Sequence, residues 1–204
     1  MRVFLVRHGA VALPRPGVFY GGTEVPLSPT GRAEAEAAAE LLAETQPTAL
    51  WSSPLERARS GAERIAARHP GLEVRIDPGL REIDRGRWTG LRPEEIERRW
   101  PGQLAAHRAD PESWRGHGGE SLGDLRRRAL AAWRRILERS GPGDLIVVSH
   151  LHPTRAILAE AAGLPLAAWP DLQLPTGSVS LLEGPPEALR PIWIGRTKPA
   201  GRPV

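Results

Sequence analysis

The stretch Val3-Phe4-Leu5-Val6-Arg7-His8-Gly9, near the N-terminus, decides the fold that we predict. Its first four residues are apolar and typical of a short buried β-strand, which would end at a histidine. A second run, Leu145-Ile146-Val147-Val148-Ser149-His150, repeats this arrangement far downstream. Ligands bind at the carboxyl ends of the strands in an open α/β sheet. We therefore expect the two histidines to meet there, around an anionic group.

The rest of the sequence alternates further strands with helices, which predicts an α/β sheet covered by helices on both faces. Ser28 before Pro29 is a typical start of a helix, because serine caps helices and proline is tolerated at the first helical position. Strands are expected over residues 1–6, 48–52, 73–76, 145–149, 178–182 and 191–194, the last two as a hairpin. Helices are expected over residues 29–43, 55–68, 121–139 and about 154–162, with short helices at 93–100 and within 104–107.

Three segments depart from this alternation. Residues 9–28 are rich in proline and glycine and form a long loop, a feature that is often functional in compact domains. Residues 78–119 are irregular and rich in arginine and tryptophan, and we predict that they cap the carboxyl edge of the sheet. Residues 195–204 are expected to be a loose tail. With 204 residues and no linker, the chain is predicted to be a single domain over residues 1–204.

The composition limits the classes of function. Lysine and arginine number 28 against 24 acidic residues, a formal net charge of +4 that suits nucleic acids or phosphorylated small molecules. The acidic residues are interspersed, so a GC-rich genome is the favoured explanation of the arginine content, and no nucleic-acid partner is expected. The absence of cysteine excludes disulfides and thiolate zinc sites. No apolar stretch approaches the roughly 18 residues of a membrane span, and nothing resembles a signal peptide, so a cytoplasmic location without membrane attachment is expected.

Six residues could carry chemistry at the predicted sheet edge. Arg7 can bind a phosphate in bidentate fashion, His8 can attack phosphorus, and Gly9 lets the backbone approach an anion. Arg57 lies in the first turn of a predicted helix, which is itself a favourable place for an anion. His150 adds a second imidazole, and Glu82, which precedes the cap, can donate a proton. Alone, Arg7-His8-Gly9 is equally compatible with a structural histidine at a strand end, and a lone arginine or glutamate is better explained by a surface ion pair. Their joint placement favours a site.

These residues lie within motifs that resemble the histidine phosphatases, or phosphoglycerate mutase-like superfamily. The resemblance extends from Arg2 to about Leu182 and depends on the order and spacing of the motifs. These motifs are Val6-Arg7-His8-Gly9, the segment 20–31 (YGGTEVPLSPTG), Ser52-Ser53-Pro54-Leu55-Glu56-Arg57-Ala58, the segment 80–86 (LREIDRG), Gly118-Gly119-Glu120-Ser121-Leu122 and Val148-Ser149-His150.

The resemblance implies a three-layer α/β/α sandwich with a mostly parallel central sheet and a small helical cap. It also implies hydrolysis through a phosphohistidine, with His8 as nucleophile and with Arg7, Arg57 and His150 around the phosphoryl group. Glu82 would protonate the leaving oxygen and then activate water, without metal or organic cofactor. The remaining residues expected to contact substrate are Gly9, Gly22, Thr23 and Leu151. A bound phosphate would repel the carboxylate of Glu82, so we expect the pKa of Glu82 to be raised.

The chain departs from the family pattern at several positions. Ala10-Val11 stands where the family usually has glutamate and a hydroxyl residue, and Gly61 where it often has threonine. His152 follows the second catalytic histidine closely; it either reaches the substrate or, as we favour, caps the next helix. Arg85 and Arg87 replace an aromatic and an acidic residue; they either bind a second anionic group or, slightly favoured, face solvent. The substrate is therefore less certain than the reaction class.

Within the family, the segments Tyr20–Leu27 and Gly118–Ser121 are most similar to the α-ribazole phosphatases of cobalamin biosynthesis. The short spacing from Glu82 to His150 favours a phosphatase over a phosphoglycerate mutase. A phospho-ligand-binding module without activity is a further alternative. The expected partner is a small phosphorylated metabolite, α-ribazole 5'-phosphate being one candidate, and the chain would act as a monomer or homodimer. The cap tryptophans could stack on the substrate, but packing of the cap against the sheet is favoured.

Overall fold

The computed structural model describes residues 1–13 and 15–198, and its centre is a six-stranded sheet in the order β3-β2-β4-β1-β5-β6. Strands β1, β4, β2 and β3 run parallel to one another, whereas β5 and β6 are antiparallel additions at one edge. The predicted mostly parallel sheet and the C-terminal hairpin are confirmed. The strands are β1 (Arg2–Arg7), β2 (Pro47–Ser52), β3 (Val74–Ile76), β4 (Asp144–Ser149), β5 (Val179–Glu183) and β6 (Arg190–Arg196).

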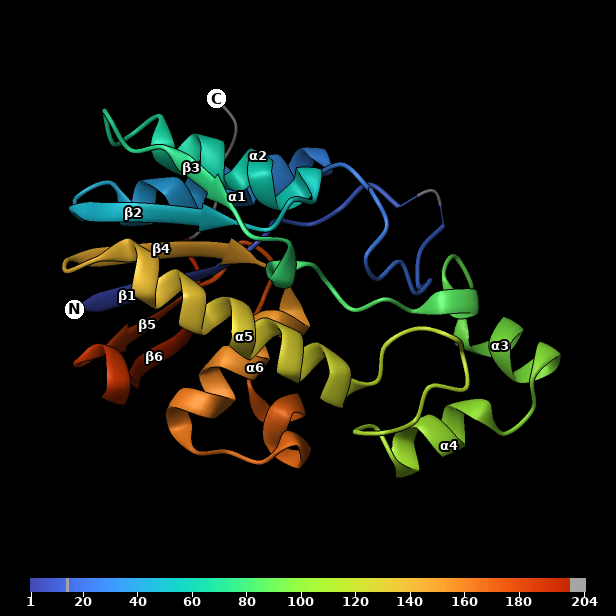
Figure 1. Ribbon diagram of the computed structural model, residues 1–204. Coiled ribbons are helices and arrows are strands. Elements are labelled where there is room, and N and C mark those ends of the chain that lie inside the picture. Colours follow the sequence, from blue (N-terminus) through green and yellow to red (C-terminus); the bar gives the residue numbers. More distant parts are fainter. Residues whose placement is uncertain (14, 199–204) are drawn as a thin grey trace.

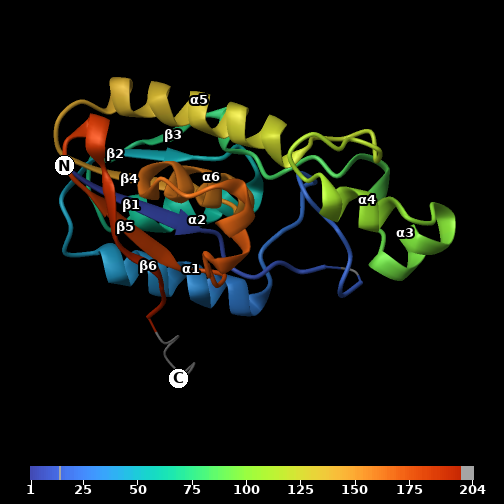
Figure 2. The same cartoon turned by 90° about the horizontal axis from the view of Figure 1, so that it is seen from below.

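Four long helices cover the two faces of the sheet. Helices α1 (Pro29–Leu42) and α2 (Glu56–Ala66) pack on one face, and α5 (Leu122–Ser140) and α6 (Leu151–Ala162) on the other. Figures 1 and 2 show the sheet between these two pairs. The fold is the expected three-layer α/β/α sandwich. Ser28 caps α1 as predicted, since its side chain accepts a hydrogen bond from the Gly31 amide.

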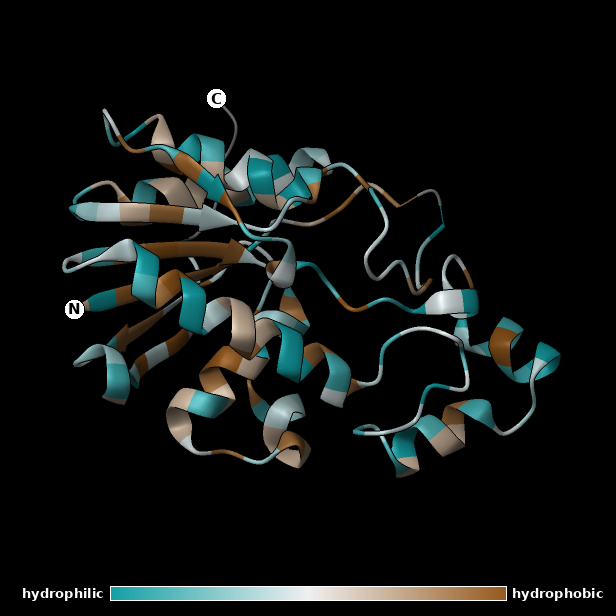
Figure 3. Ribbon diagram, in the orientation of Figure 1, coloured by the Kyte–Doolittle hydropathy of each residue, from teal (hydrophilic) through white to brown (hydrophobic). Residues whose placement is uncertain are grey.

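Alternating side chains of the central strands fill two separate cores. In β1, Val3 and Leu5 pack towards α5 and α6, whereas Phe4 and Val6 pack towards α1 and α2. Strand β4 alternates in the same way. Because both faces of these strands are buried, their sequences are continuous apolar runs rather than alternating ones. Figure 3 shows the hydrophobic residues concentrated in these strands.

The register of the parallel strands brings distant chain segments to one edge. Arg7 in β1 pairs with Ser149 in β4, and Ser52 in β2 pairs with Val148 in β4. The residues that follow these three strands are therefore neighbours, although more than 140 positions separate the first from the last. This edge of the sheet is where the candidate site forms.

Residues 78–119 lie beyond the carboxyl ends of the parallel strands (Figure 1). Trp88 is fully buried there and forms a small core with Leu91 and Ile96, against which Trp100 and Trp114 pack. These tryptophans therefore pack within a core of the cap itself, rather than against the sheet as the favoured interpretation expected. The segment contains 3₁₀ turns at Pro78–Leu80 and Gly86–Trp88 and the short helices α3 (Pro93–Arg99) and α4 (Gln103–Ala109). Two further 3₁₀ segments lie at Leu166–Asp171 and Pro186–Ala188.

Two predicted boundaries are wrong. Helix α6 begins at Leu151, three residues earlier than expected, because Pro153 lies in the first turn, where a helix does not need its N–H. Strand β6 continues to Arg196 by pairing with β5, so residues 195 and 196 are not part of a loose tail. Residues 199–204 of the predicted tail lie outside the described residues. Within the described residues, every helix is too short or too polar to cross a membrane.

Candidate active site

The carboxyl ends of β1 and β4 place His8 and His150 against each other. The centroids of the two imidazole rings are 4.9 Å apart, and the ring planes are inclined by 61°. Both side chains are almost completely buried. The meeting of two histidines that was expected from the two strand-end motifs is therefore present in the fold.

His8 is held in one orientation by its own backbone. Its Nδ1 lies 2.7 Å from the carbonyl oxygen of Gly9, so Nδ1 carries the proton and donates it, leaving Nε2 with a free lone pair. The pKa of His8 is lowered to about 3, first by burial and then by the positive charge of Arg57; the hydrogen bond to Gly9 opposes part of this shift. The ring is therefore neutral at physiological pH. A neutral imidazole with an available nitrogen is the form that acts as a nucleophile.

Arg57 occupies the first turn of α2, as predicted, and its side chain is fully buried. Its two terminal nitrogens donate to the carbonyl oxygens of Thr23, at 2.7 Å, and Gly21, at 2.8 Å. The ring of Tyr20 lies 5.2 Å from the guanidinium carbon. Arg57 thus fixes the loop over residues 20–23 at the edge of the sheet. Burial lowers its pKa, but arginine keeps its charge in proteins.

Arg7 and His150 are also held by single partners. Arg7 donates to the carbonyl oxygen of Leu174, and Nε2 of His150 lies 2.7 Å from the hydroxyl of Ser53. Burial, followed by the charges of His8 and Arg57, lowers the pKa of His150 well below its usual value. In the described part of the chain, no partner is present for three buried nitrogens, namely Nε of Arg7, Nε of Arg57 and Nδ1 of His150. Buried polar atoms are rarely left unpaired, and an anion could satisfy all three.

Glu82 is buried beside the two histidines, with 8% of its surface exposed. One carboxylate oxygen accepts a hydrogen bond from the Ile83 amide at 2.9 Å and lies 3.0 Å from Nδ1 of His152. Burial raises the pKa of Glu82, but the charge and hydrogen bond of His152, followed by the charge of His150, hold it well below the usual value. The rise in the pKa of Glu82 that we expect from a bound phosphate stays a prediction, and it would start from the low value set mainly by the contact with His152.

His152 neither caps α6, as the favoured interpretation had it, nor stands alone. It is the second residue of the helix, and the N-cap position belongs to His150. While Nδ1 faces Glu82, Nε2 of His152 lies 3.3 Å from a terminal nitrogen of Arg85. Arg85 is buried, so its expected exposure to solvent is wrong, whereas Arg87 is exposed as expected.

The four remaining predicted residues surround the site in different ways. Gly22 and Thr23 contribute carbonyl oxygens that accept hydrogen bonds from Arg81 and Arg57. Both line a cavity of about 400 Å³ that also touches Glu82. Leu151 lines a neighbouring cavity. Position 9 requires glycine for packing, since a Cβ there would overlap the carbonyl oxygen of Gly31 in α1.

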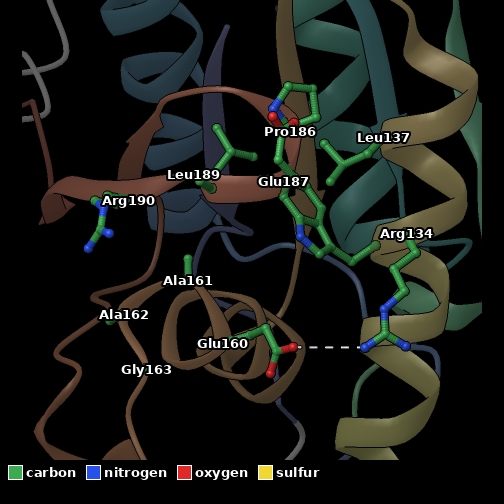
Figure 4. A pocket seen from close by; sticks show the side chains of 12 residues that line it. Arg134, Leu137, Glu160, Ala161, Ala162, Gly163, Pro186, Glu187, Leu189 and Arg190 are labelled. Carbon is green, nitrogen blue, oxygen red and sulfur yellow. Dashed lines mark ion pairs between the residues drawn. The ribbon is translucent and has the colours of Figure 1, made fainter.

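The neighbouring cavity has a volume of about 230 Å³ and joins the catalytic edge to the cap. Its lining includes Arg7, Phe19, Tyr20, Glu82, Arg85, Leu151 and His152. A larger cavity, of about 560 Å³, lies elsewhere, between α5, α6 and the segment that connects β5 to β6. Figure 4 shows this larger cavity with Arg134 and Glu160 paired across it, 3.8 Å apart. None of the predicted site residues lines it.

Ser53 and Tyr20 were not assigned a role from the sequence. Ser53 and Tyr20 lie within the motifs that indicated the family, and the Ser52-Ser53 pair at the end of a strand was the available signal. Leu174 contributes only a backbone carbonyl to Arg7, which no side-chain pattern reports. Over residues 1–13 and 15–198, no cluster of three or more histidine, aspartate or glutamate side chains is arranged to hold a metal ion.

Comparison with known proteins identifies the family. The model of the histidine phosphatase superfamily (branch 1) matches residues 3–193. The chain belongs to this superfamily. This histidine phosphatase is 36% identical over 181 residues to the glucosyl-3-phosphoglycerate phosphatase of Mycobacterium tuberculosis (strain CDC 1551 / Oshkosh), covering 84% of this chain and 79% of that protein. It is accordingly an enzyme of the phosphoric monoester hydrolase class.

Solved structures agree with the fold of this histidine phosphatase. A mycobacterial glucosyl-3-phosphoglycerate phosphatase in complex with VO3 superposes with a TM-score of 0.80 at 32% identity, over 97% of this chain and 96% of that one. The α-ribazole phosphatase of Shigella flexneri superposes with a TM-score of 0.88, over 96% of each chain. Its identity is 22%, so this second likeness shows the shared fold alone.

Proposed function

We propose that the protein hydrolyses small phosphomonoesters through a phosphohistidine formed on Nε2 of His8. The observation that carries this proposal is the hydrogen bond between Nδ1 of His8 and the Gly9 carbonyl, which leaves Nε2 available for phosphorus. The pKa of about 3 supports the same role, because the ring is neutral across the physiological range. In the first step, the bond from Nε2 to phosphorus forms as the ester P–O bond breaks.

Arg7, Arg57 and His150 are proposed to hold the phosphoryl group. Each places a buried nitrogen near His8 that lacks a partner among the described residues. Charge on the equatorial oxygens of a phosphoryl group is the main feature that a phosphoryl-transfer site stabilises. Two guanidinium groups and one imidazole supply hydrogen-bond donors and positive charge for that purpose.

Glu82 is proposed to move the protons. Binding of a phosphate dianion raises the pKa of Glu82 from its low starting value, since like charges oppose its ionisation. The carboxyl group then protonates the leaving oxygen as the ester bond breaks. In the second step, Glu82 takes a proton from water, the water oxygen attacks phosphorus, and the bond to Nε2 breaks to release inorganic phosphate and free His8.

The rest of the substrate is proposed to lie against Gly22, Thr23 and Leu151, which line the two cavities beside Glu82. The smaller cavity, about 230 Å³, is below the roughly 300–1,000 Å³ of sites for drug-sized ligands, which favours a compact metabolite. Glucosyl-3-phosphoglycerate is a candidate from the similar mycobacterial enzyme, and α-ribazole 5'-phosphate is a second candidate from the sequence motifs.

Hydrolysis of p-nitrophenyl phosphate tests the reaction class. The wild-type protein should release p-nitrophenol, and His8→Ala should abolish release, whereas His69→Gln, which changes a histidine outside the site, should keep it. After rapid quenching, ³²P from a labelled substrate should be found on the wild-type protein and be absent from His8→Ala. Turnover by His8→Ala equal to that of the wild type would overturn the proposal.

The role of Glu82 has a separate signature. Replacing a general acid costs about 10²- to 10⁴-fold, and the cost falls when the leaving group needs no proton. Glu82→Gln should therefore lose much more activity towards an alkyl phosphate than towards p-nitrophenyl phosphate. Equal losses for both substrates would contradict the acid role. Analysis of products from 3-phosphoglycerate, with and without 2,3-bisphosphoglycerate, distinguishes a phosphatase from a mutase.

A further inference from the structure

Arg85 is a buried cation outside the group that surrounds His8. It directly precedes the 3₁₀ turn Gly86–Trp88, and only 7% of its surface is exposed. Burial lowers its pKa, and the charge of Glu82 offsets part of this effect. Because an arginine side chain is always protonated in proteins, a positive charge lies inside the molecule at this point.

The contacts of Arg85 do not neutralise that charge. One terminal nitrogen lies 3.3 Å from Nε2 of His152, and the guanidinium carbon lies 5.2 Å from the centroid of the Phe19 ring. The other terminal nitrogen is buried and has no hydrogen-bond partner in the described part of the chain. Over the same residues, no carboxylate forms an ion pair with Arg85. A buried charge with no carboxylate in direct contact is costly, and an anionic ligand would reduce that cost.

The position of Arg85 connects it to the proposed phosphate site. Arg85 lines the 230 Å³ cavity together with Arg7 and Glu82. The phosphoryl group is proposed to bind beside these last two residues. A substrate that presents its phosphate to Arg7 and extends into this cavity would meet Arg85 as part of the same lining. Val18, Phe19 and Leu151 make the remaining walls of this cavity largely apolar.

We infer that Arg85 binds a second anionic group of the substrate, either a carboxylate or a second phosphate; this inference rests on the proposed phosphatase activity. Guanidinium groups bind both kinds of anion through paired hydrogen bonds. The substrate class is then a small phosphomonoester with a further negative charge a few bonds from the ester oxygen. Arg87 does not share this role, because it donates to the Gly116 carbonyl at 2.6 Å and lies over the Trp100 ring.

Four substrates test the inference. Besides the phosphate ester, 3-phosphoglycerate carries a carboxylate and fructose 1,6-bisphosphate carries a second phosphate. Glycerol 3-phosphate carries no second anion, and p-nitrophenyl phosphate measures the basal activity. The wild type should prefer at least one of the two anion-bearing substrates over glycerol 3-phosphate in kcat/KM. Arg85→Gln should reduce this preference about tenfold or more, as expected for a charge-assisted hydrogen bond. The loss should be mainly in KM, and which substrate is affected distinguishes a carboxylate from a phosphate.

Arg87→Gln is the matched control and should keep both the preference and the p-nitrophenyl phosphate activity of the wild type. An unchanged preference in Arg85→Gln, or no preference in the wild type, overturns the inference while leaving the phosphatase activity standing. Absence of hydrolysis of all four substrates by the wild type overturns the proposed function itself.

A second measurement needs no variant and covers the case in which Arg85→Gln does not fold. Phosphonoacetate carries a phosphonate and a carboxylate, whereas methylphosphonate carries the phosphonate alone. Inhibition of p-nitrophenyl phosphate hydrolysis should be about tenfold stronger or more with phosphonoacetate, for the same reason. Equal inhibition by the two compounds would argue against a carboxylate at Arg85. The same comparison between pyrophosphate and methylphosphonate tests for a second phosphate at Arg85.

Discussion

At the scale of single residues, the contact between His152 and Glu82 affects the proton transfer that we propose for Glu82. The two groups are 70 positions apart in sequence, and their atoms lie 3.0 Å apart in the fold. The charge of His152 is the largest influence that lowers the pKa of Glu82. Since His152 acts through its contact with Glu82, it is a positioning residue.

His152→Gln should therefore raise the pKa of Glu82. Because Glu82 must be protonated to act as the acid, activity should persist to higher pH, and the alkaline limb of the kcat/KM profile should move upwards. The profile is measured with an alkyl phosphate, for which the proton matters most. A lower kcat with an unmoved limb would mean that His152 has only a structural role. His69→Gln, outside the site, should leave the profile unchanged.

At the scale of elements, α1 is fixed to the nucleophile's strand by two glycines in contact. A Cβ on Gly31 would overlap the carbonyl oxygen of Ala10, which is backbone and cannot move aside easily. The Ala10 amide also donates to Glu34 of the same helix, at 2.7 Å. The first turn of α1 is therefore packed directly on the residues that follow His8.

Gly31→Ala should destabilise the protein by about 1–3 kcal/mol, the usual cost of overpacking a well-filled site, and should reduce activity. Gly61→Ala in α2 is the matched control, because its Cβ would lie 3.7 Å from a methyl group of Val148, an ordinary contact. That exchange should be neutral or stabilising by about 0.5–1 kcal/mol, since alanine favours helices. Urea unfolding measures both. Equal effects of the two exchanges would contradict the close contact.

The cap has its own pH dependence. His107 and His117 pack edge-on against Trp88, with centroid distances of 5.5 and 4.8 Å. Burial, followed by the charge of Arg85, lowers the pKa of His107 to about 4, and the same two causes lower that of His117. Unfolded histidines titrate near pH 6.5, so the unfolded state takes up protons first as the pH falls.

The stability of the cap should therefore be complete above about pH 6.5 and fall as the pH is lowered towards 4. Urea midpoints followed by tryptophan fluorescence at pH 7, 5.5 and 4.5 measure this decrease. The lowered pKa values of His8 and His150 also reduce stability as the pH falls. The variant His107→Gln isolates the contribution of the cap, and its urea midpoint should decrease less with pH than that of the wild type. Midpoints that do not depend on pH over this range would refute the expectation.

At the scale of the whole molecule, local sequence patterns predicted the architecture well. The apolar runs before His8 and His150 fixed two adjacent strands, and Ser28-Pro29 fixed the start of α1. Such features depend on a few neighbouring residues, and burial on both faces gives a strand a recognisable composition. The position of Arg57 in the first turn of α2 followed from the same kind of local signal.

Contacts between distant segments were harder to predict. The pairing of His152 with Glu82 and Arg85 depends on how residues 78–85 cross the edge of the sheet, and no pattern within that segment reports its path. The start of α6 was also misjudged, and this boundary decides the direction in which His152 points. Consequently, His8 and His150 were predicted correctly to meet at one edge of the sheet, whereas the contact of His152 with Glu82, which lowers the pKa of Glu82, was not predicted.

The contact between Gly9 and Gly31 has a consequence for attempts to alter this enzyme. A side chain at position 9 would overlap the backbone of Gly31, and a side chain at position 31 would overlap the backbone of Ala10. A second substitution at one of these positions therefore cannot make room for a side chain at the other. In a combinatorial library that randomises both positions, active members should carry glycine at each. Efforts to redirect the specificity are better spent on the cavity walls at Val18 and Leu151, which can vary in size without separating α1 from the strand that carries His8.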